Sequence, residues 1–301
     1  MPEGPEITIL SQYLLENLKD KKINKIQILS GKYLKKGIKG LNLIQNKNYK
    51  ILNIHSKGKL MWFELENNYC MTSHLGLSGF WNFEKSDNDR VRINIGNGKD
   101  IETLCYEDPR NFGNIEILTK KQLDEKLLDL ATDALKEEFT NEDFQEKIKE
   151  YLSVSKSRHE QKIFKVLMNQ KKKDGLVSGL GNYLTPEILY HCKLSPFREI
   201  GTLTKKEINN LTHSIKYIIK LSYYNNVTGY MTNFDNFIQI HKSKIDNKTY
   251  PEYHPDIKLK KTDKFKFNVY QQKTDPNGNA VEPNKELNKG RTTYWVPAIQ
   301  K

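Results

Sequence analysis

The spacing of apolar residues changes once along this chain, and that change limits the folds it can adopt. Between residues 24 and 118, apolar and polar residues alternate in short runs separated by Gly, Asn and Asp, as in strands joined by turns. From about residue 120 this alternation stops and helical patterns follow. We therefore expect an α+β protein in which a β-sandwich or barrel precedes a helical domain.

Smaller elements are expected at the two ends of the chain. Pro5 suits the first turn of a helix, and an apolar stripe at helical spacing follows it, formed by Ile7, Leu10, Leu14 and Leu18. Near the other end, residues 265–271 and 291–296 have the pattern of strands, with a turn-rich stretch around Asp275 between them. The sequence thus predicts an N-terminal helix and a C-terminal hairpin with a long polar loop.

The helical half contains several recognisable segments. Three of them cover residues 122–130, 141–152 and 156–169. Thr185, placed before Pro186, and a capping box formed by Thr204 and Glu207 indicate two further helix starts. We expect four parts: a helix and β-sandwich (1–120), a helical linker (121–149), a helical domain (150–240), and a basic connection with the hairpin (241–301).

The charge balance favours a polyanionic partner. Lys and Arg number 49 against 37 Asp and Glu, a formal charge of +12, which suits nucleic acid or anionic lipid. The three cysteines are too widely spaced for a zinc ribbon or a disulfide framework. No apolar run reaches the roughly 20 residues of a membrane span, and the acidic start of the chain is unlike a signal peptide, so we expect an intracellular protein without a membrane partner, nuclear or cytoplasmic. We also expect a monomer.

The N-terminus offers candidate chemistry. Removal of Met1 exposes the secondary amine of Pro2, which can attack an electrophilic sugar carbon and form a permanently charged iminium. Glu3 and Glu6 lie close enough in sequence to donate and accept protons. Taken alone, Pro2, Glu3, Gly4 and Pro5 are better interpreted as an ordinary helix start.

Three motifs in the first half resemble the Fpg/Nei family of bifunctional DNA glycosylases. Met1–Glu6 resembles the family's N-terminus, and Lys57–Leu60 with Ser73–Gly79 resembles its catalytic lysine and its His-Leu-Gly-Met-Ser-Gly run. The resemblance is closer to the Nei and Nei-like branch. It implies that Lys59 is a catalytic-site lysine and that His74 contacts phosphate. Each residue alone is also consistent with an ordinary strand position.

A third motif, Asp108–Gly113, resembles the family loop that fills the gap left by a flipped nucleotide. By this resemblance Arg110 and Phe112, together with Leu77, are void-filling residues. Extruding a base costs a few kcal/mol of stacking and pairing, which an inserted apolar wedge and a guanidinium offset in part. The alternative is a turn with a buried Phe.

The segment from Leu167 to Gln170, continued by Gly179–Leu189, resembles the family's helix-two-turns-helix. The resemblance implies that Gly181 and Asn182 bind DNA phosphate, because glycine lets a backbone amide approach closely at an electropositive helix start. A similar motif occurs in some ribosomal and topoisomerase proteins, so on its own it indicates nucleic-acid binding more firmly than glycosylase chemistry.

The tail resembles the family's C-terminal zinc finger without its metal ligands. The positions expected to hold cysteine are occupied by Asn277, Ala280, Val296 and Ile299. Structural zinc needs Cys or His ligands, so the resemblance implies a zincless finger, as in part of the Nei-like branch, with no metal. By the same motif, Arg291 contacts phosphate at the lesion.

The resemblance implies a bifunctional DNA glycosylase and abasic-site lyase of base excision repair that needs no cofactor. Pro2 would attack C1′ and cleave the strand by β- and then δ-elimination, Glu3 and Glu6 would move protons, and Lys59 would stabilise charge. The expected partner is damaged DNA, double-stranded or single-stranded, and oxidised pyrimidines and hydantoins are expected as substrates ahead of 8-oxoguanine. The alternative is a non-catalytic protein that binds damaged DNA with the same fold.

Overall fold

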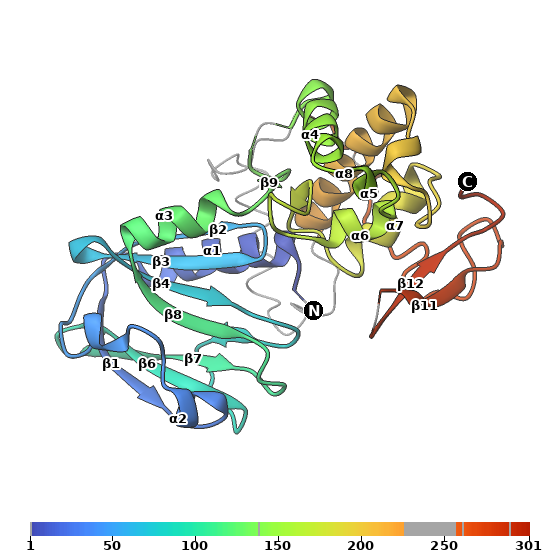
Figure 1. The fold of residues 1–301 in the computed structure, drawn as a ribbon. Coiled ribbons are helices and arrows are strands. Elements are labelled where there is room, and N and C mark those ends of the chain that lie inside the picture. The colour runs from blue at the N-terminus through green and yellow to red at the C-terminus, as the bar shows by residue number, and fades with distance from the viewer. Residues whose placement is uncertain (1, 138, 226–256, 261, 289) are drawn as a thin grey trace. The chain divides into compact units, whose positions relative to one another are not determined.

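The structure is a computed structural model, which describes residues 2–137, 139–225, 257–260, 262–288 and 290–301 (Figure 1). The chain divides into two compact units, one formed by Met1–Pro2 with Glu6–Leu128 and the other by Glu3–Pro5 with Asp129–Lys301. Most of the expected basic connection, 241–266, lies outside the described residues. The two units are described separately below.

The first unit contains two four-stranded antiparallel sheets (Figure 1). The first sheet has the order β1-β6-β7-β5, formed by Lys22–Ile28, Asp89–Asn97, Asp100–Glu107 and Phe80–Asn82. The second has the order β2-β3-β4-β8, formed by Ile51–Lys57, Leu60–Leu65, Tyr69–His74 and Asn114–Thr119. The buried rings of Phe63 on β3 and Trp81 on β5 meet edge to face at 5.7 Å, so the sheets pack against each other. The predicted β-sandwich is confirmed.

Short helical segments complete this unit. They are α1 (Gly4–Leu18), α2 (Lys32–Lys36), η1 (Leu41–Leu43), η2 (Glu66–Asn68) and α3 (Lys120–Leu128). The expected stripe of α1 is buried, with Ile7, Leu10, Leu14 and Leu18 all at most 1% exposed. The predicted N-terminal helix therefore forms and packs by this face.

The second unit is mainly helical. Its elements before the tail are β9 (Thr132–Asp133), α4 (Asn141–Ser153), α5 (Lys156–His159), α6 (Ile163–Met168), β10 (Val177–Ser178), α7 (Leu184–His191), η3 (Ile200–Thr202) and α8 (Lys205–Asn225). The capping box at α8 is present, because the Glu207 carboxylate accepts from Thr204 N–H at 2.8 Å while the Thr204 hydroxyl accepts from Glu207 N–H at 3.3 Å. The single helix expected over 156–169 is instead two short helices.

The expected start of α7 was wrong. Thr185 does not precede this helix but lies inside it, and Tyr183 is at the N-cap position with no side-chain cap of its own. The N–H groups at the helix start are instead taken by the carboxylate of Glu3. A distant residue thus replaces the local cap that the Thr185–Pro186 pattern indicated.

The expected first strand of the C-terminal hairpin was also wrong. The hairpin consists of β11 (Glu282–Asn288) and β12 (Arg291–Trp295), whereas residues 265–271 form no strand. The backbone N–H groups of Asn268, Val269 and Tyr270 donate to the buried carboxylate of Glu187 at 2.9–3.0 Å. Because those donors are occupied, they cannot pair with a strand.

An apolar cluster and one carboxylate hold the tail together. Val296 and Ile299, two of the positions expected for cysteine, pack with Val269, Val281 and Tyr190. The carboxylate of Asp275 accepts from the Tyr190 hydroxyl at 3.0 Å and from the backbone N–H groups of Asn277 and Asn279 at 2.9 and 2.8 Å. None of the four positions carries a zinc ligand, so the residues present do not fit the metal of the family's finger.

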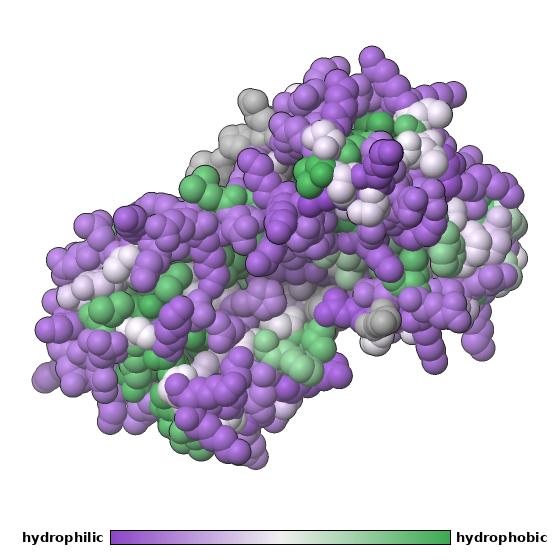
Figure 2. Space-filling model, in the orientation of Figure 1, coloured by the Kyte–Doolittle hydropathy of each residue, from purple (hydrophilic) through white to green (hydrophobic). Residues whose placement is uncertain are grey.

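The surface in view is predominantly polar. Figure 2 shows hydrophilic residues over most of it, with apolar residues in scattered areas. Within the described ranges, no helix combines the length and the apolar character needed to cross a membrane.

Candidate DNA-repair site

The expected site residues are divided between the two units. Those in the first unit are Pro2, Glu6, Lys59, His74, Leu77, Arg110 and Phe112. Those in the second unit are Glu3, Gly181, Asn182 and Arg291. The contacts of these residues within each unit are as follows.

The candidate catalytic residues near the N-terminus are buried. Pro2 is buried, and Glu3 and Glu6 are 0% and 1% exposed. Glu3 Oε1 accepts from Tyr183 N–H at 2.9 Å, and Glu3 Oε2 accepts from Leu184 N–H at 3.2 Å. A carboxylate is stabilised there because the N-terminus of α7 presents unpaired N–H groups and a positive dipole end. The residue next to the candidate nucleophile is thus fixed to the helix-two-turns-helix segment.

The glycine-rich turn before α7 is shaped by Gln170. Its side-chain nitrogen donates to the carbonyls of Met168 and Leu180, both at 2.9 Å, and its oxygen accepts from Gly179 N–H at 2.7 Å. Gly179 has φ +96°, which favours glycine. Gly4 N–H donates to the Gly179 carbonyl at 2.8 Å, so residue 4 lies against this turn.

Asn182 connects the turn to the C-terminal hairpin. Its Nδ2 donates to the Thr292 carbonyl at 3.1 Å, one residue from the exposed Arg291 at the start of β12. A hydrogen bond also joins Asn182 to Tyr270, whose pKa is raised by burial although Asn182 opposes the rise. The structure therefore brings together two of the expected phosphate-binding residues.

Glu187 supports this arrangement and was not among the expected site residues. Its carboxylate is fully buried and binds the backbone of residues 268–270 and the side chain of Asn268. Burial raises the pKa of Glu187, against the opposing effect of these hydrogen bonds. It attaches α7 to the segment that carries Tyr270. Its sequence signal is weak, because its partners lie more than 80 positions away.

In the first unit, Lys59 and His74 lie at the same end of one sheet. Lys59 is in the two-residue turn between β2 and β3, and the next residue, Leu60, pairs with His74 at the end of β4. His74 is exposed at the strand end, yet desolvation by the surrounding groups, and then the charges of Lys59, Lys126 and Lys32, lower its pKa. Its Nδ1 accepts from Gly76 N–H at 3.2 Å, so the neutral ring would carry its proton on Nε2.

The expected void-filling residues lie on two loops, 75–79 and 108–113. Arg110 is exposed and Phe112 is 58% exposed, which excludes the alternative of a turn with a buried Phe. The Arg110 guanidinium lies over the Phe112 ring, 5.8 Å from its centroid. Leu77 is half-buried on the other loop.

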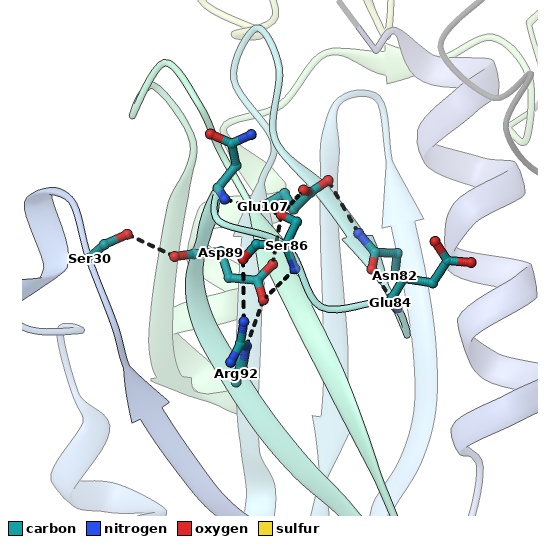
Figure 3. Close-up of polar contacts among 8 residues, drawn as sticks. Ser30, Asn82, Glu84, Ser86, Asp89, Arg92 and Glu107 are labelled. Atoms are coloured by element: carbon teal, nitrogen blue, oxygen red, sulfur yellow. Dashed lines mark hydrogen bonds and ion pairs between the residues drawn. The ribbon is translucent and has the colours of Figure 1, made fainter.

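A polar network supports the strand end from which the second loop leaves (Figure 3). Glu107, the last residue of β7, accepts hydrogen bonds from Ser86 and from Asn82. The buried Asp89 binds Arg92 Nε at 2.6 Å and also binds Ser86. These contacts tie β5, β6 and β7 together beside loop 108–113.

Three family models cover most of the chain. They are described as the formamidopyrimidine-DNA glycosylase N-terminal domain (residues 1–115), H2TH domain (130–232) and C-terminal domain (255–301). A formamidopyrimidine-DNA glycosylase of Wolbachia sp. subsp. Brugia malayi is 30% identical over 224 residues, covering 72% of this chain and 76% of that protein. One from Pasteurella multocida is 31% identical over 226 residues, covering 73% and 76%.

Similarity to solved structures supports the same fold. The crystal structure of Lactococcus lactis formamidopyrimidine-DNA glycosylase, bound non-covalently to DNA containing an abasic site, has a TM-score of 0.71, with 21% identity and 99% of each chain covered. These relatives carry the formamidopyrimidine name, so the expected closeness to the Nei-like branch stays a prediction.

Proposed function

The chain belongs to the formamidopyrimidine-DNA glycosylase family of DNA glycosylases and abasic-site lyases, and we propose that it acts in base excision repair through an imine formed at Pro2. The observation that carries this proposal is the position of Glu3. Its carboxylate is bound at the start of α7, so the residue that follows Pro2 has a fixed place. A nucleophile must be held within a narrow range of positions to react efficiently.

The proposed reaction begins when the Pro2 amine bonds to C1′ of the damaged nucleotide and the base leaves. The sugar ring opens to an iminium, whose positive charge makes a proton on C2′ acidic. Removal of that proton expels the 3′-phosphate, and a second elimination expels the 5′-phosphate. Water then hydrolyses the imine and regenerates the amine. Glu3 assists ring opening and Glu6 the eliminations, while Lys59 stabilises negative charge near the sugar.

Damaged DNA is the proposed partner, bound through its backbone. His74, Gly181, Asn182 and Arg291 are proposed to contact phosphates, and the net charge of +12 favours the encounter. The bond between Asn182 and the Thr292 carbonyl supports a shared phosphate site with Arg291. We expect the protein to act as a monomer.

Borohydride trapping on an oligonucleotide with one abasic site tests the imine. Protein with Met1 removed should give a covalent complex, and blocking the N-terminus with a tag should abolish it. Pro2→Gly replaces the secondary amine by a primary one and should weaken trapping. Tight binding without any trapped complex in correctly processed protein would remove the imine and favour a DNA-binding protein without catalysis.

We further propose that oxidised pyrimidines and hydantoins are better substrates than 8-oxoguanine. This proposal rests on Gly4 and on the tail without zinc ligands, both of which resemble the Nei-like branch. Excision rates on duplexes with thymine glycol, dihydrouracil, a hydantoin, a formamidopyrimidine or 8-oxoguanine test it. A highest kcat/KM on 8-oxoguanine or formamidopyrimidine would overturn the preference without affecting the imine.

A further inference from the structure

We propose that Asp108 is a positioning residue that couples loop 75–79 to loop 108–113, so that Leu77, Arg110 and Phe112 enter DNA as one wedge. The proposal rests on the void-filling role proposed for these three side chains. It adds a coupling that the loop sequences alone do not indicate.

The topology places the two loops side by side. Loop 75–79 leaves β4 for β5, and loop 108–113 leaves β7 for β8. At one end of the loops His74 pairs with Asn114, and at the other Phe80 pairs with Glu107. Both loops therefore cross between the same two sheets and are fixed to each other at both ends.

The carboxylate of Asp108 bridges the loops between those ends. Asp108 is 0% exposed. Its Oδ2 accepts from Gly113 N–H at 2.7 Å, next to Phe112, and its Oδ1 accepts from the Ser78 hydroxyl at 3.2 Å, next to Leu77. The Asp108 carboxylate thus binds a neighbour of a void-filling residue on each loop. These neighbours are Gly113 on one loop and Ser78 on the other.

Close packing makes the connection rigid. Gly76 has φ +66°, and a Cβ there would lie 2.6 Å from both the Gly113 nitrogen and the Phe112 carbonyl carbon. Cβ atoms added at Gly79 and Gly113 would lie 2.5 and 1.7 Å from the buried Tyr106 hydroxyl. The loops therefore have no room to slide past each other.

Arg90 fixes the other side of loop 108–113. Its Nε donates to the Asp108 carbonyl at 2.8 Å and its Nη2 to the Pro109 carbonyl at 3.1 Å. With the backbone of Asp108 held in this way, its carboxylate has a fixed position from which to hold Ser78. A shift of either loop is expected to be transmitted to the other through this residue.

The test compares substrates that do and do not need a base to be displaced. One is a duplex with a single dihydrouracil beside 2-aminopurine, whose fluorescence reports unstacking, and the other is a single-stranded oligonucleotide with an abasic site. Asp108→Ala should lower kcat/KM on the duplex by about tenfold to a hundredfold and reduce the fluorescence change. Cleavage of the single strand should stay within about twofold of wild type.

Two variants distinguish the effect of losing the bridge between the loops from the effects of losing a negative charge and of destabilising the protein. Asp108→Asn should restore duplex activity, because its Oδ1 can accept from Gly113 N–H and its Nδ2 can donate to the Ser78 hydroxyl. Asp133→Ala removes a buried carboxylate of the second unit, which accepts from Leu135 N–H at 3.0 Å and is not among the proposed site residues, and should cause no selective loss. Ser78→Ala breaks only one side of the bridge and carries the test if Asp108→Ala does not fold.

Non-additivity provides the final criterion. Ser78→Ala should give a partial loss on the duplex, and combining it with Asp108→Ala should add nothing further. Equal losses on both substrates, fully additive effects, or the same selective loss in Asp133→Ala would overturn the coupling. A wild-type protein inactive on both substrates would instead overturn the proposed function.

Discussion

The backbone N–H of Leu184 donates to the carboxylate of Glu3 at 3.2 Å, so a residue at the chain start caps a helix that begins 181 positions later. Tyr183 N–H donates to the other oxygen of the same carboxylate. Glu3 therefore has two roles in our proposal. It fixes the residue after the nucleophile, and it stabilises the helix whose preceding turn is proposed to bind phosphate.

Glu3→Ala should lower both stability and catalysis. The loss of the cap is expected to reduce the free energy of unfolding by about 1–2 kcal/mol, measured by urea denaturation, and borohydride trapping should fall in parallel. Glu207→Ala is the matched control, because it removes the capping carboxylate of α8 and leaves the proposed site unchanged. We expect a comparable loss of stability with normal trapping in that variant. Unchanged stability in Glu3→Ala would argue against the cap.

Gly113→Ala should prevent normal folding of the loops, and Tyr106→Phe should partly rescue it. A Cβ at position 113 would lie 1.7 Å from the Tyr106 hydroxyl oxygen, and Tyr106→Phe removes that oxygen. Melting temperatures of the two single variants and the double variant provide the test. A double variant less stable than Gly113→Ala alone would show that contacts other than the hydroxyl dominate, such as the His74 carbonyl 2.9 Å from the added carbon.

The fold was predictable where neighbouring residues determine it. Strands such as β6 alternate because one face is buried, and the stripe of α1 repeats at helical spacing. The start of α7 was not predictable, because its cap comes from Glu3. Strand β11 contains Pro283 and buries only Leu287 on its apolar side, so it has little alternation to detect.

In the candidate site, too, contacts between residues distant in sequence could not be predicted. Motifs predict Pro2, Lys59 and Arg291 as site residues because each lies in a short recognisable run. The hydrogen bonds of Asp108 and Glu187 were missed, because those to Ser78 and Asn268 span 30 and 81 positions. Residues 265–271 alternate like a strand, yet Glu187 takes the hydrogen bonds that a strand partner would need.

The lowered pKa of His74 predicts a pH dependence of stability. In the unfolded chain the imidazole titrates near its ordinary pKa of about 6.5, whereas in the folded protein it titrates lower. Between these two values the unfolded state binds more protons, so stability falls as pH falls through this window. Melting temperatures between pH 7.5 and 5 should show a smaller decline in His74→Gln than in wild type.

DNA binding should show the opposite trend. A phosphate beside His74 favours the imidazolium and raises the pKa of His74 in the complex, so affinity for a duplex with an abasic-site analogue should rise as pH falls toward the lowered pKa of the free protein. His74→Gln should weaken this rise at constant ionic strength, measured by fluorescence anisotropy. His191 is the matched control, because its pKa is also lowered by burial and by His213 and it is not a proposed DNA contact. The same weakening in His191→Gln would argue against a phosphate contact at His74.

The tail should depend on Asp275 and be insensitive to chelators. Burial favours the protonated acid, but hydrogen bonds from Asn279, Tyr190 and Asn277 hold the pKa of Asp275 below its usual range. The charged carboxylate therefore contributes stability above the ordinary Asp pKa of about 3.9, and that stability is lost as pH falls through the lower folded value.

Asp275→Ala should accordingly weaken both the tail and DNA binding at neutral pH, and Tyr190→Phe should reproduce part of that loss by removing one donor. EDTA should change neither the melting temperature nor the affinity for DNA, because Asn277, Ala280, Val296 and Ile299 offer no cysteine or histidine. Differential scanning fluorimetry and anisotropy with and without chelator measure these effects. A melting temperature lowered by EDTA and restored by added zinc would show that other residues bind metal and that Asp275 and the apolar cluster are insufficient to hold the tail.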